Sequence, residues 1–397
     1  MLTVLLVLAS ALAAPRLAHA QYPPLTDRDY TLDLYQGGLV GSVRMIGMGG
    51  AQIAVAEGSV GTLANAAGPA VRRTTRSGTF AYDFHIDAES AAGASDFDNN
   101  GLPDTDHSSS QLATFGLVIQ YGPWGVGLTA TTSSTKIVDD DADAMGAVIE
   151  PQGSVIKLIV ARSFAEKELT VGGGLRFASL SLVRPQVGLD DFVMLSVGGP
   201  TLEAGALWRP PEGHLRVGVE GALPVAGTSV SVTECDPLDC AGYVLPDRVE
   251  APWTVGVGVA YRFSHQPWNH AIDDFYRDER ALLLAADLVV TGPVDDGHGL
   301  EAFARHMLQP SGRHTVVSPR LGAEAELWPG WVRLRVGTYW EPARFEGVDG
   351  RLHGTAGLDV RLFGFALWGG HYRPQLSLTG DFASGYGNTG LSVGLWN

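Results

Sequence analysis

Beyond its N-terminus, the sequence lacks any run of about 20 consecutive apolar residues, so it predicts no membrane-spanning helix. The one long apolar stretch, Leu2 to Leu17, comes first. It is followed by Ala18-His19-Ala20, a small-residue pattern typical of a signal-peptide cleavage site. We interpret residues 1–20 as a signal peptide rather than a membrane anchor, with the mature chain beginning near Gln21. The protein is therefore expected to be exported.

Basic residues and cysteines are also scarce. Lys and Arg number 27 against 43 Asp and Glu, a formal net charge of −16, which argues against nucleic-acid binding because that needs a basic surface. The two cysteines, Cys235 and Cys240, lie close together in the chain. In an exported protein this spacing predicts a small disulfide, and a metal-binding pair is the weaker alternative because no His or further Cys is nearby. No Ser/His/Asp grouping stands out, so we do not expect an enzyme.

What the sequence does contain is alternation with a period of two, from about Ser77 to the C-terminus. In residues 253–263, every second residue is Val or aromatic, and the residues between are Thr, Gly, Ala or Arg. This period is typical of β-strands. Fourteen such segments begin near Thr79, Leu112, Gly125, Ser154, Glu168, Phe192, His214, Ala251, Arg280, Thr315, Trp331, Gly354, Pro374 and Asn388.

An even number of strands behind a signal peptide predicts an all-β fold. We expect residues 77–397 to form a closed antiparallel transmembrane β-barrel of about fourteen strands in a bacterial outer membrane, because a bilayer tolerates strands only when no edge is left unpaired. A soluble β-sandwich is the alternative, in which the polar face of each strand would be the solvent face.

The connections between these segments alternate in length. Tyr121–Trp124 and Phe164–Lys167 are short, whereas Ala88–Ser110 and Thr135–Gly153 are long. With the N-terminus in the periplasm, the short connections would be periplasmic and the long ones extracellular. Ser264–Glu279 is too long for a periplasmic turn, so either it contains a short helix or the strand count slips there.

Aromatic residues gather at the short turns, which favours a membrane-interface girdle over ordinary packing at hairpin ends. They are Tyr121, Trp124, Trp208, Trp328, Trp331, Trp368 and Tyr372.

The polar faces of the predicted strands carry charges of both signs. In a barrel these side chains would point into the lumen, and Arg–carboxylate pairing there predicts a filled or narrow interior rather than an open water pore. The lumen candidates are Arg176, Arg216, Glu220, Arg262, Asp287, Arg320, Glu324, Arg333, Arg335, Asp359 and Arg361.

An acidic segment after the first predicted strand resembles a calcium-binding loop. In Asp96-Phe97-Asp98-Asn99-Asn100-Gly101, oxygen-bearing side chains alternate so that they can converge on a hard cation, and the glycine permits the turn. The twelfth position is His107 rather than Glu, so the loop is no complete EF-hand and is closer to a thrombospondin type 3 repeat. The candidate Ca²⁺ ligands are Asp96, Asp98, Asn100, Asp104 and Asp106. A solvated acidic loop is the alternative.

The segment between the signal peptide and the first predicted strand carries a glycine-rich pattern. Residues 41–57, GSVRMIGMGGAQIAVAE, followed by Asn65-Ala66-Ala67-Gly68, resemble the N-terminal region of the FadL-like outer-membrane proteins, which include a PorV-like branch. The resemblance implies a fourteen-stranded barrel whose hatch is residues 21–76, with Arg44, Gly47, Gly49, Gly50, Asn65 and Gly68 as its marked positions. Ala66 stands where the family has proline, so the rigid turn is lost and gating by the hatch is an open question.

The same resemblance implies a function. FadL-like channels take up hydrophobic small molecules, such as long-chain fatty acids or hydrocarbons, and the partners would then be such compounds and the outer-membrane lipids. The alternative is a PorV-like scaffold that binds secretion or surface proteins through its acidic extracellular loops. The charged lumen favours the scaffold slightly, and the larger part of the resemblance favours the channel.

Overall fold

The computed structural model describes residues 22–35, 37–71, 80–92, 96, 98–101, 109–139, 147–185, 191–227, 235–270, 276–367 and 370–395. In this part of the chain, no helix has both the length and the apolar character needed to cross a membrane.

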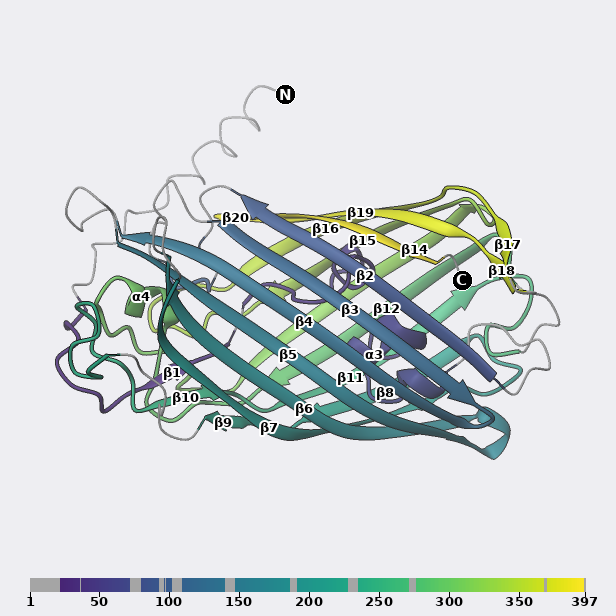
Figure 1. Ribbon diagram of the computed structural model, residues 1–397. Helices are drawn as coiled ribbons and strands as arrows, with labels where there is room; N and C mark the ends of the chain where they lie inside the picture. Colours follow the sequence, from purple (N-terminus) through teal and green to yellow (C-terminus); the bar gives the residue numbers. More distant parts are fainter. Residues whose placement is uncertain are drawn as a thin grey trace, which may run out of the picture.

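The dominant element is a closed barrel of fourteen antiparallel strands (Figure 1). In order around the wall from the first strand, they are β2 (Phe80–Ala92), β3 (Ser109–Tyr121), β4 (Trp124–Asp139), β5 (Ala147–Phe164), β6 (Leu169–Arg184), β7 (Phe192–Trp208), β8 (Leu215–Ala222), β11 (Thr254–Phe263), β12 (Ala281–Thr291), β14 (Val316–Trp328), β15 (Val332–Glu341), β16 (Arg351–Arg361), β19 (Pro374–Ala383) and β20 (Tyr386–Leu395). β20 pairs with β2 and closes the ring. Each of the fourteen segments predicted from alternation coincides with one of these strands, so the predicted fold class is confirmed.

The barrel has apolar side chains on its outside and charged side chains on its inside, the reverse of the arrangement in a soluble protein. On β11, Val255 and Val257 point outward and are 49% and 48% exposed, while Ala260 between outward residues points inward and is buried. Charged side chains such as Arg335 and Asp359 are buried inside. An apolar exterior around a charged interior suits a bilayer and not water, which decides between the barrel and the β-sandwich.

The two ends of the barrel differ as predicted. Long connections gather at one end, which we call the long-loop end, and the tight turns such as that between β3 and β4 lie at the other, the short-turn end (Figure 1). The long connection at 264–280 does lie at the short-turn end, and its described residues form no helix. The strand count nevertheless holds, because fourteen strands close the barrel. The connection from β16 to β19 also contains a small hairpin, β17 (Phe365–Leu367) and β18 (Gly370–Tyr372).

The N-terminal segment corrects one expectation. Residues 22–35 lie at the long-loop end, not at the short-turn end where a periplasmic N-terminus would be. There β1 (Thr31–Asp33) pairs in parallel with β10 (Arg248–Ala251) and β13 (Gly297–His298), and β10 pairs with β9 (Val225–Gly227). Alternation along three residues is too short a signal to reveal such a strand, so the sequence could not place it.

Between β1 and the barrel, the chain passes through the lumen toward the short-turn end, where β2 begins (Figure 1). We call residues 37–71 the plug. It contains α2 (Val43–Gly47), α3 (Gly58–Ala64) and a 3₁₀ turn, η2 (Gly68–Ala70), and most of it is buried. Ser42 caps α2 by accepting a hydrogen bond from the Met45 backbone N–H at 3.2 Å. Among the described residues, two further short helices lie outside the plug: η3 (Ala165–Lys167) in a tight turn and α4 (Leu300–Ala304) among the long loops.

Candidate functional site in the barrel lumen

Ion pairs join the plug to the barrel wall near the short-turn end. Arg44 on α2 donates two hydrogen bonds to Glu324 on β14, at 2.9 and 3.0 Å. Glu324 also accepts from Arg335 on β15 at 2.6 Å, and Arg335 in turn binds Asp359 on β16 with both Nη atoms. Glu324 and Arg335 are direct cross-strand partners, so the sheet itself aligns them. We call these four residues the Arg44 network; it fixes α2 against three strands.

Two more contacts hold the plug by charge. Arg216 on β8 forms an ion pair with Glu57 at 2.5 Å, and its guanidinium lies 3.5 Å from the ring centre of Trp268. Asp287 on β12 accepts hydrogen bonds from the backbone N–H groups of Gln52 and Ile53, at 2.7 and 2.8 Å. These charged groups therefore bind plug atoms instead of lining an open pore.

Asn65 replaces the missing proline as the fixed point of the plug's last turn. Its Nδ2 donates to the carbonyl oxygens of Ile53, Ala206 and Val219, at 3.0, 3.3 and 3.2 Å, and its Oδ1 accepts from the Ala67 backbone N–H at 2.9 Å. The side chain is buried. A single amide thus ties the plug to itself and to β7 and β8, so the turn is held without a ring at position 66.

The glycines of the plug pattern lie where backbones approach closely. Gly49 has φ +60°, and a Cβ there would lie 2.6 Å from the Thr338 nitrogen in the wall. Gly50 has φ +75°, so this turn needs a left-handed pair that glycine supplies without strain. Gly47 accepts a hydrogen bond from Thr355 Oγ1 at 3.2 Å, and Gly68 packs against the backbone of Gly61.

Between the plug and the wall lies a cavity of about 290 Å³. One side is apolar, lined by Leu34 from the segment before the plug and by the plug residues Leu39, Val40, Met45, Ile53 and Leu63. The other carries three cations and two carboxylates, Lys157, Arg176, Arg320, Glu203 and Glu220, an excess of one positive charge. Lys157 forms an ion pair with Glu203 at 3.0 Å. Arg176 and Arg320 form no ion pair and no side-chain hydrogen bond with any residue that the structure describes.

The remaining lumen candidates lie toward the short-turn end. Arg262 forms an ion pair with Glu279 at 3.4 Å, and Arg333 forms one with Glu326 at 3.3 Å. Arg361 does not join these pairs: its guanidinium stacks 3.5 Å from the ring centre of Trp331 at the turn after β14. At the other end, a disulfide joins Cys235 and Cys240.

Sequence reasoning missed several residues of the lumen. Lys157 lies on the inward face of β5 between Ile156 and Leu158, so the same alternation that identified Arg176 was a sufficient signal for it. A buried cluster on β15, β16 and β19 gave no comparable signal. There His353 lies 2.8 Å from Asp381 and 2.6 Å from Glu341.

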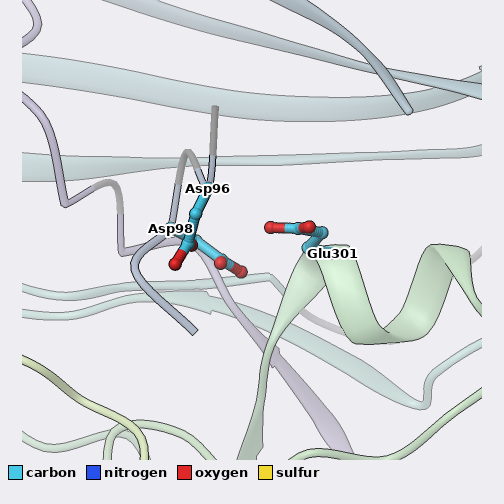
Figure 2. Close-up of side chains that lie close together, drawn as sticks. All are labelled: Asp96, Asp98 and Glu301. Atoms are coloured by element: carbon cyan, nitrogen blue, oxygen red, sulfur yellow. The ribbon is translucent and has the colours of Figure 1, made fainter. Parts of the chain in front are cut away.

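The acidic segment that resembles a calcium loop lies at the long-loop end, and Glu301 on α4 joins it. The carboxylates of Asp96, Asp98 and Glu301 lie within 4.8 Å of one another, and Figure 2 shows them facing a common space. Asn100 is close by in the same loop, since its N–H donates to Asp96 Oδ1 at 2.8 Å. The other two predicted ligands, Asp104 and Asp106, fall outside the described residues.

Comparison with known proteins finds similarity in structure alone. No protein-family model matches the sequence, and no curated protein matches it either. The fold is similar to that of a FadL homologue from Pseudomonas aeruginosa, with a TM-score of 0.57 and 11% identity over 92% of this chain and 98% of that one. It is also similar to the toluene transporter TodX of P. putida (TM-score 0.51, 12% identity, 90% and 98% covered) and to CymD, a monoaromatic hydrocarbon channel (0.50, 13%, 90% and 96%). These neighbours are transport channels. The chain therefore has the fold of the FadL-type outer-membrane channels, a closed fourteen-stranded barrel with an N-terminal segment ahead of it.

Proposed function

We propose that this protein is an outer-membrane channel for the uptake of hydrophobic small molecules. The observation that supports this most is the cavity between the plug and the wall, because one of its sides is an apolar surface inside the barrel. Its volume is near the lower end of the ~300–1,000 Å³ of small-molecule sites. The FadL-type fold, shared with a toluene transporter and a monoaromatic hydrocarbon channel, supports the same class of cargo.

The charges of the cavity favour a cargo with an acidic head, such as a fatty acid, over a neutral hydrocarbon. Leu34 and five apolar plug side chains would hold the tail. Arg176 and Arg320 would hold the carboxylate, since a guanidinium binds a carboxylate through two parallel hydrogen bonds. A hydrocarbon would leave both guanidiniums without an acceptor, which is costly where water is scarce.

The test is binding of decanoate, methyl decanoate and decane to the purified full chain, followed by uptake of the same compounds by cells that depend on this protein. Charge-assisted hydrogen bonds contribute about 1.5–3 kcal/mol, so Arg176→Gln and Arg320→Gln should each weaken decanoate binding roughly 10- to 150-fold. The ester, which has no charge, should bind the variants and the wild type alike. Arg361→Gln is the matched control, because that guanidinium stacks on Trp331 at the short-turn end, away from the cavity.

Failure of all three compounds to bind would contradict the channel proposal. Binding that is unaffected by either substitution would contradict only the acidic head group.

The alternative, a scaffold for secretion or surface proteins, is favoured by one observation: the Arg44 network and the Glu57–Arg216 pair close the short-turn half of the lumen with buried ion pairs. A scaffold would copurify with a stable protein partner at its long loops and would bind none of the three compounds. Native mass spectrometry of the gently extracted protein distinguishes a retained lipid from a retained partner.

A further inference from the structure

We propose that a groove on the outer face of the barrel binds a lipid with an uncharged, hydroxyl-rich head group, that is, a glycolipid. The groove has a volume of about 1080 Å³ and crosses seven neighbouring strands, from β19 through β20 and β2 to β6. The proposal does not depend on the cargo of the channel, because the groove lies on the other side of the wall from the cavity beside the plug.

The lining side chains place the groove outside the barrel. Leu378 and Leu391 line it and are 47% and 48% exposed. On β5, Ser154 lines the groove, whereas the next residue, Val155, lines the cavity between the plug and the wall. Successive side chains of a strand point to opposite faces, so the groove and that cavity are separated by the thickness of the wall.

Two rows of direct cross-strand neighbours form the floor of the groove on β2 to β6. The row nearer the short-turn end consists of Ala88, Ala113, Thr132, Ser154 and Ser179. The next row consists of Ser90, Gln111, Ser134, Gln152 and Ser181. Most of these side chains are shorter than the Ile, Leu and Phe side chains that cover the wall nearer the short-turn end, so the outer surface is hollowed along both rows.

The lining changes from apolar to polar along the groove. On β20 it is Leu391, four residues from the short-turn end of that strand at Leu395. On β6 it is Ser179, ten residues from the short-turn end of that strand at Leu169. The strands run obliquely along the wall (Figure 1), so the groove crosses them on a slant, with its apolar end deeper in the wall and its polar end nearer the long loops.

The polar end lies at the edge of the apolar band of the wall. On β5, the outward side chains of Val160, Leu158 and Ile156 are apolar and exposed, and the next outward residues toward the long-loop end are Ser154 and Gln152. A bilayer places its hydrocarbon against such a band and its head groups at the edge of it. The groove therefore offers one surface to the tail of a lipid and another to its head.

The polar end offers hydrogen bonds without charge. Ser154 and Ser179 share a hydrogen bond of 2.8 Å, and Ser181 and Ser196 share one of 3.0 Å. Each pair uses only one of its two hydroxyl hydrogens in that bond, so it can donate the other and can also accept. Sugar hydroxyls likewise donate and accept, which makes them the matching head group.

A phosphate head group does not match this lining. Among the described residues that line the groove, the only charged one is Glu89, which is buried on the inward face of β2. Glu150 lies at the border, where it accepts hydrogen bonds from Ser134 at 2.6 Å and Gln152 at 2.9 Å, and its carboxylate would repel an anion. The outward cation of β4, Lys136, is not among the lining residues. Phosphate is bound by Arg and Lys, which this surface does not supply.

The experiment is native mass spectrometry of the full chain released from lipid nanodiscs. The nanodiscs contain equal amounts of diglucosyl diacylglycerol, phosphatidylglycerol and phosphatidylcholine with the same acyl chains. We expect one retained glycolipid per chain, enriched about tenfold or more over each phospholipid, because a few neutral hydrogen bonds contribute a factor of that order. Ser154→Trp fills the groove and should abolish this retention. Ala204→Trp is the matched control, because Ala204 is exposed on the outer face of β7 but does not line the groove.

A second substitution tests the head group separately from the shape of the groove. Gln152→Leu leaves the groove open but removes an amide, so the enrichment of the glycolipid over the phospholipids should fall severalfold. Assembly of each variant is verified by its heat-dependent gel mobility, and if Ser154→Trp fails to assemble, Ala113→Trp and Gln152→Leu decide.

Three results would overturn the proposal. Equal retention of the three lipids would mean that the wall holds lipid without regard to its head group. Retention that survives both tryptophan substitutions would place the lipid elsewhere, as would its displacement by decanoate, the probe for the cavity beside the plug. A dimer whose formation Ser154→Trp prevents would mean that a second copy of the chain, and not a lipid, covers the groove.

Discussion

Replacing Arg44 with glutamine should loosen the plug without unfolding the barrel. Arg44 is the plug's own member of the Arg44 network, and it reaches the wall through two hydrogen bonds to Glu324. The side chains of Arg44 and Glu324 are 13% and 11% exposed, so water screens their interaction only weakly. Glutamine is shorter than arginine and carries no charge, so it cannot form the two charge-assisted hydrogen bonds to Glu324, and the barrel's ladder hydrogen bonds are untouched.

The size of the effect depends on the hydrogen bond that Glu324 keeps when Arg44 is replaced. Removing one partner of a buried pair costs about 3–5 kcal/mol when the other charge is stranded. Glu324 is not stranded in Arg44→Gln, because Arg335 still donates to it at 2.6 Å. The loss is therefore that of charge-assisted hydrogen bonds, about 2 kcal/mol, which corresponds to a roughly 30-fold larger population of the open plug.

Hydrogen–deuterium exchange measures that population directly, because amides of a locally opened segment exchange in proportion to it. In Arg44→Gln, peptides covering residues 43–56 should exchange roughly 30-fold faster, while peptides from β4 to β6 exchange as in the wild type. Arg361→Gln should have no effect on the plug, since Arg361 stacks on Trp331 instead of joining the network. Exchange of 43–56 at the wild-type rate in Arg44→Gln would refute the idea that this network holds the plug.

Three further substitutions test other parts of the molecule. Asn65→Ala leaves three carbonyl oxygens and one N–H without their amide partner, so thermal unfolding should begin at lower temperature, with a loss of about 1–3 kcal/mol; unchanged unfolding would mean that water replaces the amide. Gly49→Ala requires a left-handed alanine against the Thr338 nitrogen, so assembly yield, scored by heat-dependent gel mobility, should fall, and a normal yield would show that the wall can shift. Arg344→Met strands buried Asp33, which should cost about 3–5 kcal/mol locally and speed trypsin cleavage at Arg28, whereas equal cleavage would show that β1 is held by other contacts.

The barrel could be predicted because the pattern that identifies each strand lies within that strand's own sequence. A strand between lipid and lumen must alternate at every residue, and each of the fourteen segments, for instance 253–263, carries that alternation in its own sequence. The short strands of the long-loop end lack such a signal. β1 is three residues long and its partners are parallel segments more than two hundred residues away, so its pairing depends on tertiary contacts alone.

The residues of the candidate site also differ in how far the sequence could predict them. Alternation indicated that Arg335 and Asp359 face the lumen, but it could not indicate that Arg335 pairs with Glu324 and Asp359 while Arg176 pairs with nothing described, because that depends on the register between neighbouring strands. The acidic loop shows the same limit. Its spacing was visible in the sequence, but Glu301 was not, since proximity to Asp96 arises only when the barrel brings two loops together.

The plug is held at both ends, and this restricts how it can open. At the long-loop end, β1 lies between two strands, and Asp33 forms a buried ion pair with Arg344 at 2.9 Å. At the short-turn end, the chain continues into β2 of the wall. A segment fixed at both ends cannot leave the lumen as a flap, so opening of the lumen requires displacement of its middle, which the Arg44 network holds. Exchange in Arg44→Gln should therefore rise in 43–56 and stay slow in 31–33. Equal loss of protection in both would mean that the plug moves as one body and that β1 is released with it.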